Sequence, residues 1–145
     1  MRIDCALLCD AATVREGLLH VLGGGVTRAT RDSFPAPLAM TLALRVMIHP
    51  TEAAKAHELT MILLAQDGER VVELSVEFGL NDPESIPTGE EASLPLPIPM
   101  PDLPLPHAGS YSFELLIDGI HQATVPFKVV EGETESAPPP KQEED

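Results

Sequence analysis

The sequence predicts an all-β protein, an immunoglobulin-like antiparallel β-sandwich of about eight or nine strands. Apolar residues alternate with a period of two in several segments, which is typical of half-buried strands. Two Asp-Gly pairs separate such segments, and no window of ten residues shows the spacing of an amphipathic helix. A sandwich is favoured over a barrel because the strands offer two apolar faces that could pack about 10 Å apart.

The first predicted strand covers residues 3–9. Its alternation places Ile3, Cys5, Leu7 and Cys9 on one face. Residues 18–22 and 26–30 flank the run Gly23-Gly24-Gly25, so the sequence predicts a loose hairpin through these glycines.

A long strand is predicted over residues 38–48, ending before Pro50. Residues 57–66 and 70–78 follow, joined by Asp67-Gly68. Asp-Gly between alternating segments favours a type I′ turn, in which both central residues have positive φ.

Prolines alternate with large apolar residues in the segment 94–101, Leu-Pro-Leu-Pro-Ile-Pro-Met-Pro. In an extended strand every second residue would then have no backbone N–H to donate. This predicts an edge strand whose outer side cannot pair with a further strand. Two alternatives remain open: a polyproline-II ligand for an SH3- or WW-type partner, which Pro101-Asp102-Leu103-Pro104 would fit, and a plain extended connector.

The last predicted hairpin joins residues 109–117 to 120–130 through Asp118-Gly119, again as a type I′ turn. The preceding Gly109-Ser110-Tyr111 resembles the entry to a late strand of immunoglobulin-like domains, where the glycine bends the chain and the tyrosine packs at the corner.

The chain length of 145 residues fits one domain, predicted over residues 1–130, followed by a tail at 131–145. The tail holds six acids, one base and three consecutive prolines, so we expect it to be disordered. It would serve as a solubilising end or dock a basic partner. The net charge of −14 and only nine basic residues argue against nucleic acid and anionic membranes as partners.

Cys5 and Cys9 are the only cysteines. Four residues of extended strand separate them by about 13 Å, beyond the reach of a disulfide, so we expect two reduced thiols. The N-terminus has an acid at position 4 and no signal-peptide pattern, and no apolar run is long enough to span a membrane. These features predict a cytoplasmic protein.

No motif in the sequence carries a recognisable chemistry. The five histidines form neither H-x-H nor H-E-x-x-H, and no serine lies in a G-x-S-x-G elbow. Gly23–Gly25 lacks the lysine of a phosphate loop. The sequence therefore predicts no catalytic residue, no cofactor and no metal site. A hydrolytic enzyme is the least favoured interpretation, and would require histidines and carboxylates that converge in space.

Two predicted strands, 18–22 and 57–65, are apolar on both faces. With no helix to cover them, their outward apolar residues suggest an interface formed by Leu18, Leu22, Ile62 and Leu64. The favoured function is a non-catalytic protein-interaction or assembly module with a protein partner or a homo-oligomeric state. The alternative is a small-molecule-binding sandwich with an apolar pocket between its sheets.

Residues 9–25, Pro35-Ala36-Pro37-Leu38, the hairpin 109–119 and Pro126-Phe127-Lys128-Val129 together resemble a family of small bacterial proteins of the actinobacterial type, classed as a domain of unknown function. The resemblance covers about residues 1–130. It implies an all-β sandwich and transfers no activity or site residue.

Overall fold

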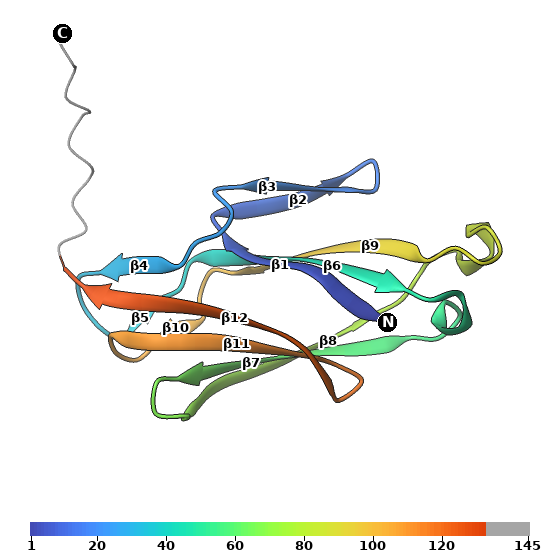
Figure 1. Cartoon of the computed structure of the whole chain (residues 1–145). Helices are drawn as coiled ribbons and strands as arrows, with labels where there is room; N and C mark the ends of the chain where they lie inside the picture. The colour runs from blue at the N-terminus through green and yellow to red at the C-terminus, as the bar shows by residue number, and fades with distance from the viewer. Residues whose placement is uncertain (133–145) are drawn as a thin grey trace, which may run out of the picture.

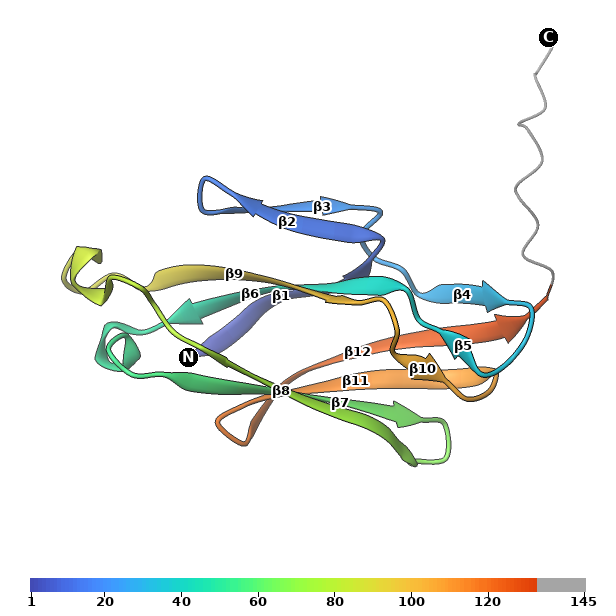
Figure 2. The same ribbon diagram turned by 180° about the vertical axis from the view of Figure 1, so that it is seen from behind.

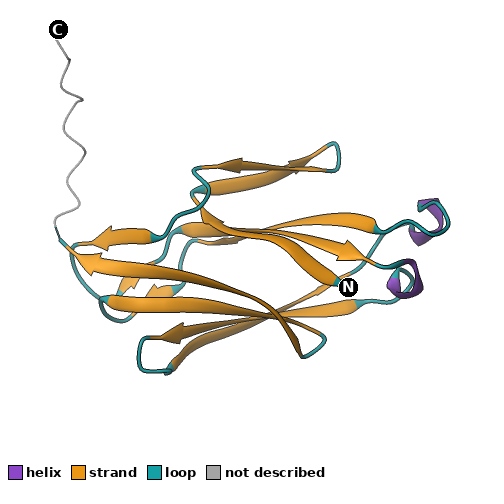
Figure 3. Ribbon diagram, viewed as in Figure 1, coloured by secondary structure: helices purple, strands orange, loops and turns teal. Residues whose placement is uncertain are grey.

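The computed structural model describes residues 1–132, and these form an all-β fold without an α-helix (Figure 1, Figure 3). The twelve strands are β1 (Arg2–Cys9), β2 (Ala11–Arg15), β3 (Leu18–Leu22), β4 (Arg28–Arg31), β5 (Ala36–Pro37), β6 (Met40–Ile48), β7 (His57–Ala65), β8 (Arg70–Phe78), β9 (Ala92–Met100), β10 (Pro104–Leu105), β11 (Gly109–Ile117) and β12 (Ile120–Glu131). Two short 3-10 turns, η1 (Pro50–Glu52) and η2 (Pro83–Ser85), interrupt the loops.

The strands form two larger sheets that face each other, as Figures 1 and 2 show. One sheet has three strands in the order β1-β6-β9, and the other has five in the order β4-β12-β11-β7-β8. Two small pairs, β2–β3 and β5–β10, complete the fold. The all-β prediction is confirmed, with two exceptions in detail. There are more strands than the eight or nine expected because several are very short, and the pair β4–β12 is parallel.

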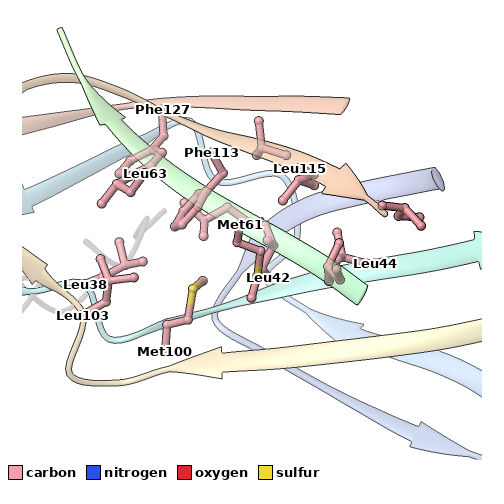
Figure 4. Close-up of a cluster of buried hydrophobic side chains, with 14 of the residues drawn as sticks. Leu38, Leu42, Leu44, Met61, Leu63, Met100, Leu103, Phe113, Leu115 and Phe127 are labelled. Carbon is pink, nitrogen blue, oxygen red and sulfur yellow. The ribbon is translucent and has the colours of Figure 1, made fainter. Parts of the chain in front are cut away.

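The core lies between the two larger sheets (Figure 4). β6 contributes Leu42 and Leu44, and β11 contributes Phe113; each of these side chains is at most 1% exposed. The ring of Phe127 stacks on Phe113 with ring centres 5.7 Å apart and on Tyr111 at 5.6 Å. The other side chains labelled in the close-up are Leu38, Met61, Leu63, Met100, Leu103 and Leu115. Strands from both sheets thus supply their apolar faces to a common interior, as the period of two predicted.

β9 is the edge strand that the alternating prolines predicted. It pairs only with β6, in a register that sets Leu94 opposite Val46, Leu96 opposite Leu44 and Ile98 opposite Leu42. The segment 92–100 is therefore a strand of the sheet and not a plain connector, whereas Pro101-Asp102-Leu103-Pro104 lies beyond β9 and its recognition by an SH3- or WW-type partner stays a prediction.

The glycine run does not form a hairpin. β3 pairs with β2 instead, and Gly23–Gly25 carry the chain back to the body, where the N–H groups of Gly25 and Val26 donate to the Leu8 carbonyl at 3.0 and 2.9 Å. The predicted pairing of 18–22 with 26–30 is wrong because residues 11–15 lie nearer along the chain and close a tight two-residue turn with β3.

The alternation of side chains between the two faces of β1 changes part-way along the strand. A β-bulge between Ile3 and Cys5 shifts the pairing with β6, so Leu8 is buried in the core while Cys5 and Cys9 lie on the opposite face. The predicted common face of Ile3 with Cys5 is wrong, since one extra residue in a strand inverts the alternation that follows.

The two Asp-Gly turns differ. Asp118 and Gly119 have φ of 50° and 82°, which confirms the type I′ turn. At the other turn only Gly68 has positive φ, and its N–H donates to the Ala65 carbonyl while the Ala65 N–H donates to the Glu69 carbonyl. That hairpin closes through a longer turn ending at a left-handed glycine, so the predicted type I′ turn there is wrong.

The predicted domain boundary at residue 130 falls close to the end of β12, which continues through Glu131. The disorder expected for the acidic tail concerns residues 133–145, which lie outside the described part of the chain.

Candidate interaction surface

The hairpin β2–β3 stands outside the three-stranded sheet, on the side away from the core (Figures 1 and 2). Its two-residue turn consists of Glu16 and Gly17, with φ of 55° and 73°. Two consecutive positive φ values define the type I′ turn, whose twist matches that of a tight hairpin. Gly17 adopts this conformation without strain, whereas Glu16 carries a modest cost.

The hairpin presents apolar side chains to solvent on its outer face. Arg15 lies opposite Leu18 and Ala11 opposite Leu22, so these residues share one face. Leu18 is 63% exposed and Leu22 is 69% exposed. Leaving two leucines this open forgoes the stabilisation of about 2 kcal/mol that burial of each would give.

The inner face of the hairpin covers the sheet only in part. Val21 lies against the body, because its Cγ1 atom is 2.8 Å from where a side chain on Gly24 would begin, and the Leu7 side chain is close to the same point. Even so, Val14 and Val21 remain 41% and 37% exposed. The inner face of the hairpin is therefore apolar and only partly buried, while the outer face mixes Leu18 and Leu22 with Thr13, Arg15 and His20.

A groove with a volume of 430 Å³ runs between the hairpin and the sheet. Residues 17–21 form one side, and the opposite side consists of Cys5, Arg45, Ser93 and Pro95. Its surface is thus composed of a proline ring, a thiol, aliphatic side chains, one hydroxyl, the His20 imidazole and one guanidinium. A groove of this kind suits an apolar side chain or an extended peptide better than a highly charged molecule.

The guanidinium of Arg45 already has a partner. Its Nε donates to Oδ1 of Asp4 at 2.9 Å and its second nitrogen donates to Oδ2. This two-point hydrogen bond holds the pKa of Asp4 below its ordinary value of 3.8 and raises the pKa of Arg45. The Arg45 guanidinium is therefore already paired and is not free to bind an anionic ligand in the groove.

The four predicted interface residues do not form one surface. Leu18 and Leu22 lie on the hairpin, whereas Ile62 and Leu64 lie on β7 of the five-stranded sheet. Their neighbours Met61 and Leu63 are buried in the core, so Ile62 and Leu64 point to the outer face of that sheet, where both are half-buried. The two pairs occupy different sheets, and only the hairpin pair is strongly exposed.

The five histidines are scattered. His20 lies on the hairpin, His49 accepts a hydrogen bond at the start of η1, and His107 contacts Tyr111. His57 contacts Asp118 and His121 contacts Glu114. Within residues 1–132 no three His, Cys, Asp or Glu side chains come together in a way that could hold a metal ion.

One cluster resembles catalytic chemistry in its residue types. On the outer face of the five-stranded sheet, Glu114 receives hydrogen bonds from His121 at 2.7 Å, Thr124 at 2.6 Å and Ser112 at 3.0 Å. Burial works to raise the pKa of Glu114, but these three donors outweigh it and lower the pKa. His121 Nε2 also lies 3.1 Å from the Thr124 hydroxyl, but that hydroxyl donates to Glu114, so the three side chains converge on the carboxylate.

A second apolar groove, of 290 Å³, lies at the edge where β8 and β9 face each other. Its lining includes Val72 and Leu74 from β8, Met100 from β9, Leu103, and one acid, Asp102. This groove is the feature closest to the expected pocket between the sheets. It opens along the strand edges, and ligand binding there stays a prediction.

Val14 and Val21 also belong to this surface, and they are not among the four interface residues predicted from the sequence. Their signal was present, because Ala12-Thr13-Val14 alternates and Glu16-Gly17 can supply two positive φ values. The glycines at 23–25 are a stronger turn signal than Glu16-Gly17. For that reason residues 18–22 are predicted to pair with 26–30 rather than with 11–15.

No helix of the described residues is long and apolar enough to cross a membrane. A family model described as a family of unknown function (DUF6941) matches residues 4–130. No curated protein matches the chain.

Proposed function

We propose that this chain, which belongs to the family of unknown function DUF6941, is a non-catalytic module that binds another protein through the hairpin β2–β3. One observation carries the proposal: Leu18 and Leu22 are 63% and 69% exposed on a hairpin that projects from the body. Singly exposed leucines are common on protein surfaces. Two on one face of a projecting hairpin, on either side of His20 and next to a groove lined mainly by apolar groups, form an exposed apolar surface of the kind that marks interaction sites.

The partner's binding segment is expected to be apolar and extended. The groove of 430 Å³ has room for a few aliphatic side chains, and its one charge pair, Arg45 with Asp4, is internally satisfied. The net charge of −14 of the chain favours a partner that is neutral or basic around its apolar segment.

We also propose that the two larger sheets form an immunoglobulin-like sandwich. The Tyr111 hydroxyl donates to the carbonyl of His107, four residues upstream. A tyrosine bonded back to the preceding backbone at the start of a late strand is typical of immunoglobulin-like sandwiches. This contact supports an immunoglobulin-like arrangement. The two free cysteines, Cys5 and Cys9, support a reducing, cytoplasmic setting.

The test removes the two exposed leucines together. The double variant L18S/L22S should lose a partner captured from cells by the wild-type chain, because the apolar contacts at the centre of the interface would be gone. We expect affinity for the isolated partner to fall by about tenfold or more, measured by titration calorimetry.

The matched control is I120S. Ile120 is 65% exposed at the turn of a different hairpin, β11–β12, so this variant removes comparable exposed apolar area elsewhere. It should retain the partner. Equal binding by wild type and L18S/L22S would refute the proposal, provided both unfold at the same temperature.

A further inference from the structure

β8 is a free edge of the five-stranded sheet, and its backbone groups can be assigned a direction. The N–H of Ala65 and its carbonyl both bond toward the β8 side of the hairpin, while the Glu58 carbonyl on the same strand accepts from Asp118 on the β11 side. Direction alternates along an antiparallel strand. Leu59, Met61 and Leu63 therefore face β8, and their partners on β8 face back toward β7.

The remaining residues of β8 direct their backbone outward. With Val72, Leu74 and Val76 bonded to β7, the N–H and carbonyl groups of Glu73, Ser75 and Glu77 point away from the sheet. No strand of the described chain covers this side of β8. The edge thus presents a ladder of unused donors and acceptors, which is a template for a further strand.

The other edge strand facing this side, β9, cannot play that role. The Leu8 carbonyl bonds to Gly25 and Val26, so its opposite residue Leu42 faces β9. Ile98, opposite Leu42, then faces β6, and the neighbouring Pro97 and Pro99 occupy the outward positions. Those positions have no N–H. One edge is closed by prolines and the other has none from Arg70 to Phe78.

The side chains of β8 are complementary to a second β8 running antiparallel. Leu74 and Val76 are each 38% exposed, so an apolar strip continues to the edge. Arg70 begins the strand and pairs with Glu73 of the same copy, while Glu77 lies near the end of the strand, so opposite charges stand at opposite ends. Within one copy, Glu77 lies directly opposite Glu58, an unfavourable pair that a nearby cation would relieve.

We propose that β8 pairs antiparallel with β8 of a second copy of this chain, with Leu74 on the two-fold axis. In this register Ser75 lies opposite Glu73 of the second copy, and the two exchange both backbone hydrogen bonds. Val72 lies opposite Val76 of the second copy, and Arg70 comes next to Glu77 of the second copy. A two-fold interface repeats each contact, so Arg70, which already contacts Glu73 of its own copy, meets Glu77 of the second copy twice and offsets the repulsion of Glu73 with the diagonal carboxylates. The proposal is independent of the hairpin β2–β3.

The first experiment places a proline in the outward ladder. S75P removes an N–H that the fold itself does not use, and by symmetry removes two hydrogen bonds from the dimer. We expect the dimer dissociation constant, measured by sedimentation equilibrium at physiological salt, to rise by about tenfold or more. The matched control S93P sits at an outward position of β9, in phase with Pro95 and Pro97, and should leave the dimer unchanged.

The second experiment uses charge reversal, which keeps the backbone intact. R70E alone and E77R alone each bring like charges together across the two-fold and should dimerise more weakly than wild type. When the two variants are mixed, an acidic side chain again meets a basic one at both symmetry-related contacts of the heterodimer, which should therefore recover wild-type affinity. Such rescue requires that a second copy, rather than another protein, occupies the edge.

Three outcomes would overturn the proposal. The first is a wild-type chain that stays monomeric throughout a concentration series. The second is a dimer with unchanged affinity in S75P. The third is a dimer lost in L18S/L22S yet kept in S75P, which would place self-association on the hairpin instead.

Discussion

At the scale of single residues, His57 is a buried histidine whose two ring nitrogens both have hydrogen-bond partners. The ring is 7% exposed, with Nδ1 at 2.6 Å from the Asp118 carboxylate and Nε2 at 2.9 Å from the Glu52 carbonyl. Both neighbours are acceptors, so the contacts are best satisfied when both ring nitrogens carry protons. Asp118 also receives the Glu58 N–H at 2.9 Å. The pair therefore ties η1 and β7 to the turn between β11 and β12.

The two pKa values shift in opposite directions. Burial lowers the pKa of His57, but the hydrogen bonds to Asp118 and the Glu52 carbonyl outweigh it and raise the pKa above 6.5. The hydrogen bond from His57 lowers the pKa of Asp118 below 3.8. His57 contributes its full stabilisation when the pH is below the pKa that it has in the unfolded chain. This stabilisation is lost as the pH rises through the higher pKa that His57 has in the folded protein. That of the aspartate is full above its unfolded pKa and is lost as pH falls through the folded value.

The variant D118N should reduce this pH dependence. Asparagine tolerates the left-handed conformation at φ 50° and can still accept the Glu58 N–H, so the turn survives. Wild type should be less stable at about pH 8.5 than at about pH 5.5, and D118N should show a smaller difference, with a loss of about 1 kcal/mol at the lower pH. We place this loss below that of a buried charged hydrogen bond because Asp118 is 49% exposed. Urea unfolding at both pH values measures these free energies of unfolding. An equal difference between the two pH values in wild type and D118N would contradict the role given to the His57–Asp118 pair.

At the scale of elements, β7 shows how one strand serves two environments. Leu63 is fully buried and contacts the core, while the adjacent Leu64 lies on the outer face of the sheet. L63A should lower the free energy of unfolding by about 3 kcal/mol, since it removes transfer energy and leaves a cavity. L64A should cost less than about 1 kcal/mol. Chemical denaturation of both variants checks the prediction, and similar losses would mean that the outer face is covered.

How well an element could be predicted depended on whether its signals were local. The prolines of β9 and the Asp118-Gly119 turn act through their own backbone, so the edge strand and the last hairpin could be derived from sequence. The bulge in β1 depends on its pairing with β6, far along the chain, and nothing in residues 2–9 reveals it.

The candidate surface shows the same division. Residues 18–22 are apolar on both faces of the strand, and from this the exposure of Leu18 and Leu22 was correctly predicted. It could not show that Ile62 and Leu64 belong to a different sheet, because the placement of strands in sheets follows from tertiary packing.

At the scale of the whole molecule, the hairpin β2–β3 is the least integrated part of the two-sheet body. Its backbone joins the sheets through few hydrogen bonds, and its side chains remain exposed. Amides of β2 and β3 should exchange with solvent by local opening, orders of magnitude faster than those of β6 and β11, which require global unfolding. Hydrogen-exchange mass spectrometry measures this directly. Equal protection of hairpin and core would contradict the projecting arrangement.

The parallel pair β4–β12 also has a consequence for synthesis. β4 hydrogen-bonds to no strand but β12 among the described residues, with Arg28 opposite Lys128. A chain made from its N-terminus must therefore carry β4 unpaired until nearly all of residues 1–131 have been translated. The five-stranded sheet can close only after β12 enters between β4 and β11, so chains released before that point would expose Phe113 and Leu115 to aggregation and to proteases.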